Sequence, residues 1–215
     1  VLVRDQEGVW ADAQSIIDNT TFSYVYLDDK TLGQASNYRL LVPLYNLFKA
    51  NNQSFKGFIV QTTIKELVNK LVRDKELDDC IAYYEIGLEV FSDVFYQKYK
   101  KPITEKMFDL ILQEPSLKNR IIYNIMIGVP GTTIKEYKQT LGLLKKHDAY
   151  VHHINIYNFS IYDNTELAQE QIKTRDEDAF EYAKIKSFHS QQDHSLVLQY
   201  YNLFLDYFKE KILKY

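Results

Sequence analysis

Polar side chains that could bind a small molecule recur at alternate positions of five short, β-rich runs of the sequence. Residues at alternate positions of a strand face the same side of a sheet. In the third run, Glu85 and Glu89 share one face with Tyr83 and Gly87, while the opposite face is apolar. The other runs place on one face Tyr26, Gln61, Asn124, His153, Asn155 and Tyr157.

Two carboxylates on one face do not suit an ordinary strand of a parallel sheet, which is apolar on both sides. Burying them without partners would cost several kcal/mol each. A lumen filled by water or ligand removes that cost. The pattern therefore predicts a small-molecule site inside a parallel barrel or half-barrel. An internal hydrogen-bond network without a ligand is the alternative.

A second candidate binding element is the run Gly128-Val129-Pro130-Gly131, followed by Thr132 and Thr133. Its two glycines allow close approach of the backbone, and the free N–H groups of a following helix could receive a carboxylate or phosphate. The run follows a strand, and ligands of parallel α/β folds bind at the carboxyl ends of the strands. We therefore expect Gly128, Pro130 and Gly131 to contact a ligand.

The elements that must position these residues alternate along the chain. The β-rich runs are residues 22–27, 58–62, 80–88, 121–127 and 151–159. Amphipathic stretches separate them, including residues 36–51, where Pro43 should bend the helix, and helices capped by Thr63 with Glu66 and by Thr133 with Glu136. This alternation predicts an α/β fold with right-handed βαβ crossovers, either doubly wound or part of a barrel.

The two ends of the chain depart from this repeat. Residues 10–18 read as a helix without a preceding strand, so one unit lacks its β half. From Glu166 onward we expect the strands to stop and residues 195–213 to form a long amphipathic helix that covers the barrel. The predicted domains are therefore a barrel over residues 1–165 and a helical cover over 166–215.

Composition narrows the functional classes. The 215 residues are 46% hydrophobic with a formal net charge of −3, which gives no basic excess for nucleic acid. No apolar run approaches the roughly 18 residues that span a bilayer, so we expect no membrane partner. Cys80 is the single cysteine, and a reducing, cytoplasmic setting fits best.

Two other chemistries are disfavoured. His152 and His153 are neighbours on one run and should face opposite sides, so they cannot chelate one metal ion together. Glu85 and Glu89 would lie about 13 Å apart on a strand. That distance is too long for the paired carboxylates of a glycosidase.

Several of these segments resemble the second half of the radical S-adenosylmethionine (SAM) enzyme core. They are residues 84–89 followed by Phe91-Ser92-Asp93, then Pro102-Ile103-Thr104, then residues 123–132 with Ile-Gly-Val-Pro-Gly. Leu27-Asp28-Asp29 resembles a strand end of the subgroup that often carries a cobalamin domain, and residues 153–156 resemble the last barrel strand. The resemblance covers residues 3–166.

The resemblance implies a partial parallel (β/α)6-type barrel lacking its first strand, with a C-terminal helical extension. It also implies a [4Fe–4S] cluster that binds SAM, an electron from a reductant such as flavodoxin or ferredoxin, and a 5′-deoxyadenosyl radical that attacks a small-molecule substrate. Cobalamin is a further implied cofactor.

The resemblance also assigns roles to individual residues. Asp28 and Asp29 match the strand end facing the methionine amino group, and Glu85 and Glu89 match the strand reaching its ribose or methionyl part. Gly128, Pro130 and Gly131 match the turn beside adenine. The residues that would line the substrate lumen are Tyr26, Gln61, Asn124, His153, Asn155 and Tyr157.

The sequence departs from the family in one respect. It contains no Cys-x-x-x-Cys-x-x-Cys motif, so the cluster ligands must lie outside this chain segment or be lost. The first reading gives an enzyme as a full-length protein, of which this segment alone is inactive. The second gives a catalytically inactive barrel that binds a small molecule or a protein.

Overall fold

A curved sheet of five parallel strands organises the molecule, in the order β1-β2-β3-β4-β5. The computed structural model describes residues 5–28, 31–162, 180–182, 185–189 and 194–212. The strands are β1 (Tyr24–Leu27), β2 (Gly57–Thr62), β3 (Ile81–Glu89), β4 (Ile121–Ile127) and β5 (Val151–Asn158). Each lies within two residues of a predicted run, so the parallel α/β prediction is confirmed.

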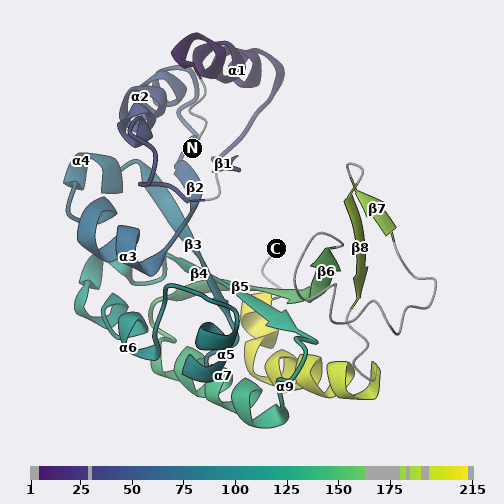
Figure 1. Ribbon diagram of the computed structural model, residues 1–215. Helices are drawn as coiled ribbons and strands as arrows, with labels where there is room; N and C mark the ends of the chain where they lie inside the picture. Colours follow the sequence, from purple (N-terminus) through teal and green to yellow (C-terminus); the bar gives the residue numbers. More distant parts are fainter. Residues whose placement is uncertain (1–4, 29–30, 163–179, 183–184, 190–193, 213–215) are drawn as a thin grey trace.

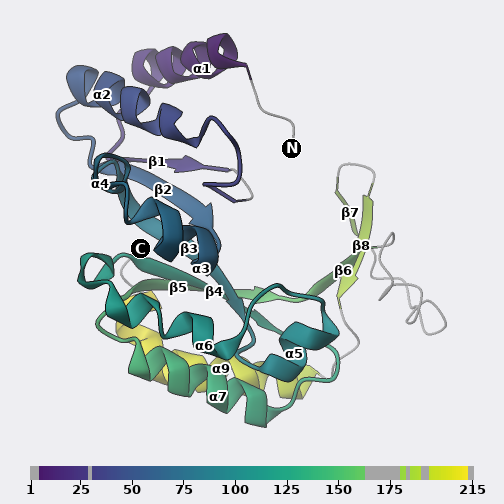
Figure 2. The same cartoon turned by 60° about the vertical axis from the view of Figure 1, so that its left-hand side comes forward.

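Helices cover the convex side of this sheet and leave its concave side open toward the right of Figure 1. Figure 2 shows the same layering from another direction. The helices are α1 (Gln6–Asn19), α2 (Leu41–Asn51), α3 (Ile64–Glu66), α4 (Lys75–Asp78), α5 (Asp93–Lys98), α6 (Glu105–Phe108), α7 (Ile134–Lys146) and α9 (His194–Ile212), with a π-helical turn at Leu67–Leu71. Sequential parallel pairing with helices on one side makes this a partial barrel rather than a doubly wound sheet.

The sheet stays open at β1. Among the described residues, β2 is the sole strand paired with β1, and α1 packs against α2. That the unit beginning with α1 lacks its β half stays a prediction.

The two faces of the sheet differ in burial as the alternation predicts. The convex face buries Phe58, Val60, Tyr84, Ile125 and Ile154 in the core. The concave face leaves Tyr26 49% and Tyr157 47% exposed. None of the helices in the described part of the chain combines the length and apolar character needed to cross a membrane.

Two helix predictions need correction. Pro43 does not bend a helix, because α2 starts at Leu41 and Pro43 falls in its first turn, where a missing N–H costs little. Thr63 caps α3 by accepting from the Glu66 N–H, but Glu66 does not complete a box; its carboxylate lies 3.9 Å from Lys70 Nζ. The full box forms at Thr133 and Glu136 on α7.

The prediction that strands stop at Glu166 is wrong. β6 (Ser160–Tyr162), β7 (Phe180–Tyr182) and β8 (Ile185–His189) form an antiparallel sheet in the order β6-β8-β7. The long C-terminal helix is confirmed as α9, which buries Tyr200 and Phe204 against Tyr137 of α7. The division at residue 165 stays a prediction.

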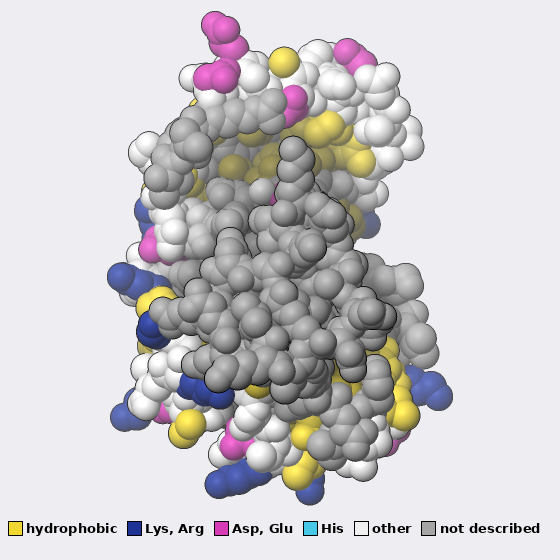
Figure 3. Space-filling view, turned by 45° about the vertical axis from the view of Figure 1, so that its right-hand side comes forward, with side chains coloured by type: hydrophobic (Ala, Val, Ile, Leu, Met, Phe, Trp, Pro, Cys, Tyr) yellow, Lys and Arg dark blue, Asp and Glu magenta, His cyan; other side chains and the backbone are white. Residues whose placement is uncertain are grey.

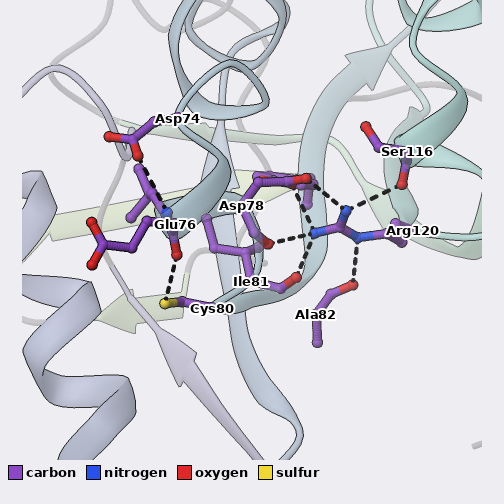
Figure 4. A network of polar contacts seen from close by, with 10 residues as sticks. Asp74, Glu76, Asp78, Cys80, Ile81, Ala82, Ser116 and Arg120 are labelled. Carbon is purple, nitrogen blue, oxygen red and sulfur yellow. Dashed lines mark hydrogen bonds and ion pairs between the residues drawn. The ribbon is translucent and has the colours of Figure 1, made fainter.

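Arg120 closes the amino ends of β3 and β4 (Figure 4). Its guanidinium lies 2.9 Å from Asp78 Oδ1 and donates to the backbone carbonyls of Asp78, Ile81, Ala82 and Ser116. Tyr84 donates to the same carboxylate at 2.6 Å. Because every charge here has its partners inside the fold, this end of the sheet is built for stability.

Candidate functional site

A cavity of the described residues opens at the carboxyl ends of β2 and β3, and we call it the strand-end pocket. It has a volume of about 400 Å³, within the range of small-molecule sites. The predicted site residues Gln61 and Glu89 line it together with Gly87. Two hydrogen bonds connect the loop after β1 to the end of β2: Leu32 N donates to Gln61 O, and Thr62 Oγ1 donates to Leu32 O. This loop therefore forms one wall of the pocket through Thr31 and Gln34.

Glu89 is held in an unusual backbone conformation at the rim of the strand-end pocket. A bulge interrupts the pairing of β3 with β4, because Gly87 pairs with Asn124 and Glu89 with Ile125, and Glu89 has a φ of 60°. Bulges and left-handed non-glycine residues concentrate at functional sites, where they redirect a side chain. A Cβ at Gly87 would lie 3.5 Å from Glu89 Oε1, so the carboxylate turns back over Gly87.

Lys101 is a site residue that the sequence reasoning missed. Its Nζ lies 2.6 Å from Glu89 Oε1, and both residues line the strand-end pocket. Tyr96 also lines it and donates to Leu88 O at 3.2 Å; burial and then the Glu89 charge raise the pKa of Tyr96. Twelve residues separate Lys101 from Glu89 along the chain. The feature of the sequence that could have pointed to Lys101 is its position directly before the Pro102-Ile103-Thr104 segment.

A second group of predicted residues meets in the middle of the concave face, and we call it the Glu85 cluster: Tyr26, Glu85, Asn124, Asn155 and Tyr157. Asn155 Nδ2 donates to Asn124 Oδ1 at 2.9 Å, and Asn124 Nδ2 donates to Glu85 Oε1. Glu85 is 5% and Asn124 8% exposed. The structure therefore brings together side chains from β1, β3, β4 and β5 that the alternation had placed on one face.

The charge of Glu85 contributes to the raised pKa values of the two tyrosines of the cluster. Partial burial and the Glu85 carboxylate, to which Tyr26 hydrogen-bonds, raise the pKa of Tyr26 to about 12. Partial burial and the same charge raise the pKa of Tyr157. Both hydroxyls therefore stay protonated at neutral pH and serve as neutral donors.

The Gly128–Gly131 turn takes the expected form at the end of β4 but does not line the strand-end pocket. Gly128 and Gly131 have φ values of 78° and 81°, which glycine adopts without strain. Tyr99 Oη and Lys98 Nζ donate to Pro130 O at 3.1 and 3.3 Å. The turn is thus anchored to α5, and its contact with a ligand stays a prediction.

The remaining predicted residues are less informative. Asp28 is exposed and close enough to Tyr26 to raise the pKa of its hydroxyl, whereas Asp29 lies outside the described residues. His153 is half-buried and pairs with Ile122.

His152 does not follow the predicted alternation. The register of β5 shifts next to it, and its ring stacks on Tyr83 with centroids 3.9 Å apart, so it lies on the concave side.

Metal ligation by the described residues has little support. No group of three or more His, Cys, Asp or Glu side chains in the described part of the chain could hold an ion. Cys80 is buried and donates to Glu76 O at the amino end of β3; burial, followed by three nearby carboxylates, raises the pKa of its thiol to about 11. The thiol therefore stays protonated at neutral pH, and a protonated thiol is a poor metal ligand.

Comparison with known proteins supports the fold. No protein-family model and no curated protein sequence matches the chain. The coproporphyrinogen III oxidase HemN from Escherichia coli, described as a radical SAM enzyme, superposes with a TM-score of 0.58 at 12% identity, over 98% of this chain and 48% of that one. Elp3 from Methanocaldococcus infernus gives 0.54 at 14% identity, over 76% and 43%.

The sheet, its covering helices and the site at the strand ends define an α/β partial barrel. More specifically, the chain has the fold of a radical SAM enzyme core, as the resemblance predicts. It spans about half the length of the solved structures that it matches.

Proposed function

We propose that this chain forms the SAM- and substrate-binding part of a radical SAM enzyme whose [4Fe–4S] cluster is ligated outside this segment. The carrying observation is the strand-end pocket, with Glu89 held over Gly87 by a bulge in β3. Its place at the carboxyl ends of parallel strands is where such folds bind their ligands.

The residues around the strand-end pocket have donors and acceptors suited to SAM. The Glu89 carboxylate would accept hydrogen bonds from ribose hydroxyls or from the methionine ammonium group. Lys101, now paired with Glu89, would be free to bind the methionine carboxylate once a ligand hydroxyl or ammonium replaces it. Gln61 offers an amide at the opposite wall.

The other assigned residues complete the proposed site. Asp28 and Asp29 would face the methionine amino group, and the Gly128–Gly131 turn would approach the adenine. When bound and reductively cleaved, SAM supplies the 5′-deoxyadenosyl radical that removes hydrogen from a substrate. A flavodoxin or ferredoxin would deliver the electron, and cobalamin would be a further cofactor of the full-length protein.

Equilibrium dialysis of radiolabelled SAM against the purified chain tests the binding role. Glu89→Gln should weaken binding about tenfold, because it replaces charge-assisted hydrogen bonds by neutral ones. Glu76→Gln, an exposed carboxylate at the other end of the sheet, removes the same charge and should leave affinity unchanged. Equal affinities for the wild type and Glu89→Gln would remove Glu89 from the site.

The single buried cysteine favours a second candidate, a barrel that binds a small molecule without chemistry. Anaerobic reconstitution of the full-length gene product separates the two. The enzyme should show cluster absorbance and release 5′-deoxyadenosine from SAM. A product with neither property, in a protein that still binds SAM, would support the non-catalytic barrel.

A further inference from the structure

Glu85 is a buried carboxylate that forms no ion pair within the described part of the chain. It is 95% buried, since 5% is exposed, and none of the ion pairs among the described residues includes it. Its partners are neutral donors, the Asn124 amide and the Tyr26 hydroxyl. A buried charge stabilised by neutral groups alone costs free energy that folding does not recover. Such a group is a candidate for binding a ligand.

The hydrogen bonds around Glu85 run in one direction. Asn155 donates to Asn124, and Asn124 donates to Glu85, so each amide uses an N–H toward the carboxylate. This order leaves the acceptor oxygens, one on Glu85 and Oδ1 of Asn155, to receive donors from outside the amide chain. A ligand that fits should therefore bring hydrogen-bond donors, and a positively charged donor also matches the carboxylate.

Two half-exposed aromatic rings stand on either side of this acceptor group. Tyr26 comes from β1 and Tyr157 from β5, at opposite edges of the sheet, yet Tyr157 is close enough to contribute to the raised pKa of Tyr26, and Glu85 raises the pKa of both. The curvature of the sheet brings them together over Glu85. Aromatic faces beside a carboxylate attract organic cations.

No ion pair among the described residues competes for Glu85. In Figure 3 hydrophobic side chains gather in the upper part of the face shown, and the visible Lys and Arg side chains lie around its margin. Within the described part of the chain, the lysine paired to a carboxylate of β3 is Lys101, which pairs with Glu89. Glu85 is about 13 Å from Glu89 at roughly 3.3 Å per residue, and it does not line the strand-end pocket.

We propose that the Glu85 cluster binds a protonated amine of the substrate, so that the substrate is an organic cation held below the cofactor. That the bound cation is the substrate rests on the proposed function. The cation site itself is inferred from the described side chains alone. The ammonium would donate to Glu85 and Asn155 Oδ1 and lie between the rings of Tyr26 and Tyr157.

Binding of n-butylammonium to the purified chain, followed by saturation-transfer NMR, tests the assignment. It should bind, whereas 1-butanol and butyrate, which match its length without the positive charge, should bind at least tenfold more weakly. Glu85→Gln keeps the size of the side chain and should weaken n-butylammonium at least tenfold. Glu7→Gln, on exposed α1, changes net charge equally and should have no effect.

Tyr157→Leu gives a second variant that does not depend on a buried position, because this side chain is 47% exposed. It removes an aromatic wall and should weaken n-butylammonium severalfold. Equal binding of 1-butanol and n-butylammonium, or unchanged binding in both variants, would overturn the cation site.

The same samples separate this inference from the proposed function. The inference reassigns Glu85 from the cofactor, where the resemblance puts it, to the substrate, so SAM binding should be retained in Glu85→Gln, and SAM and n-butylammonium should bind together. If SAM displaced n-butylammonium, Glu85 would belong to the cofactor site and the inference would fail. If SAM bound to no form while n-butylammonium still required Glu85, the proposed function would fail and the cation site would stand.

Discussion

Charged side chains are satisfied at the amino ends of the strands and left available on the concave face and at the carboxyl ends. The side chains of Arg120 and Asp78 are 21% and 10% exposed. The guanidinium N–H groups of Arg120 donate to one carboxylate and to four backbone carbonyls. Glu85 has two neutral donors, and Glu89 has one exposed lysine. Charge compensation thus differs between two parts of one sheet, and in parallel α/β folds ligands bind at the carboxyl ends of the strands.

The largest expected effect comes from removing Arg120. Arg120→Ala leaves Asp78 buried without its cation and four carbonyls without donors, so the free energy of unfolding should fall by about 3–5 kcal/mol. Urea denaturation followed by circular dichroism measures it. Arg39→Ala breaks pairs with Asp74 and Glu76 at a side chain that is 55% exposed, and should cost about 0–1 kcal/mol. Equal losses in the two variants would contradict the contrast.

His147 extends the same contrast to pH. It is fully buried, and its Nδ1 is hydrogen-bonded to Tyr123 Oη at 2.9 Å. Its Nε2 has no hydrogen-bond partner among the described residues. Burial, followed by the charge of Lys146, lowers the pKa of His147 to about 4. The folded state therefore holds the neutral ring while the unfolded chain binds a proton below its ordinary pKa of about 6.5.

The stability contributed by neutral His147 is fully present above pH 6.5 and is lost as pH falls toward 4. The loss should reach about 3 kcal/mol at the lower limit, since one unit is worth 1.36 kcal/mol. Urea midpoints between pH 7 and 4 measure it, and His147→Gln should flatten this part of the profile. A profile that is equally steep in the variant would assign the effect to other groups.

A smaller effect is expected at the carboxyl ends, where Thr133 caps α7. Its side chain accepts from Lys135 N, and the Glu136 carboxylate accepts from the Thr133 backbone N–H. Thr133→Ala should cost about 1 kcal/mol. Thr104 caps α6 without a side-chain hydrogen bond, so Thr104→Ala should be close to neutral by the same thermal or urea measurement.

The smallest change should come from Glu85. Because this carboxylate is buried without a cation, Glu85→Gln should leave the free energy of unfolding within about 0.5 kcal/mol of the wild type or raise it slightly. Asp78→Asn, where a cation is present, should be destabilising. If Glu85→Gln unfolded the protein as Asp78→Asn does, Glu85 would have a structural role and the contrast between the two regions would be lost.

Local patterns were enough to predict much of the fold. The alternation that placed Glu85, Asn124 and Asn155 on one face survived because strand periodicity is a property of the backbone. The caps at Thr63 and Thr133 and the left-handed glycines at 128 and 131 depend on neighbours within a few residues. Burial of the opposite face follows from the same alternation.

Contacts between distant residues could not be predicted in this way. Arg120 reaches Asp78 across 42 positions, and Lys101 reaches Glu89 from a loop. The bulges at Glu89 and beside His152 depend on the register of neighbouring strands. β7 and β8 formed where the local pattern had suggested helix, because β8 pairs with both β6 and β7 and this pairing is not visible in a local window.

The sequence by itself determined which residues could face a lumen and which turn could approach a ligand, because periodicity and glycine conformation are local. Only the tertiary structure decided which of those residues meet. The curvature of the sheet set Tyr26 and Tyr157 over Glu85, and the strand register divided the predicted residues between the strand-end pocket and the Glu85 cluster. Charge compensation depends on distances across strands, and those distances exist only in the folded chain.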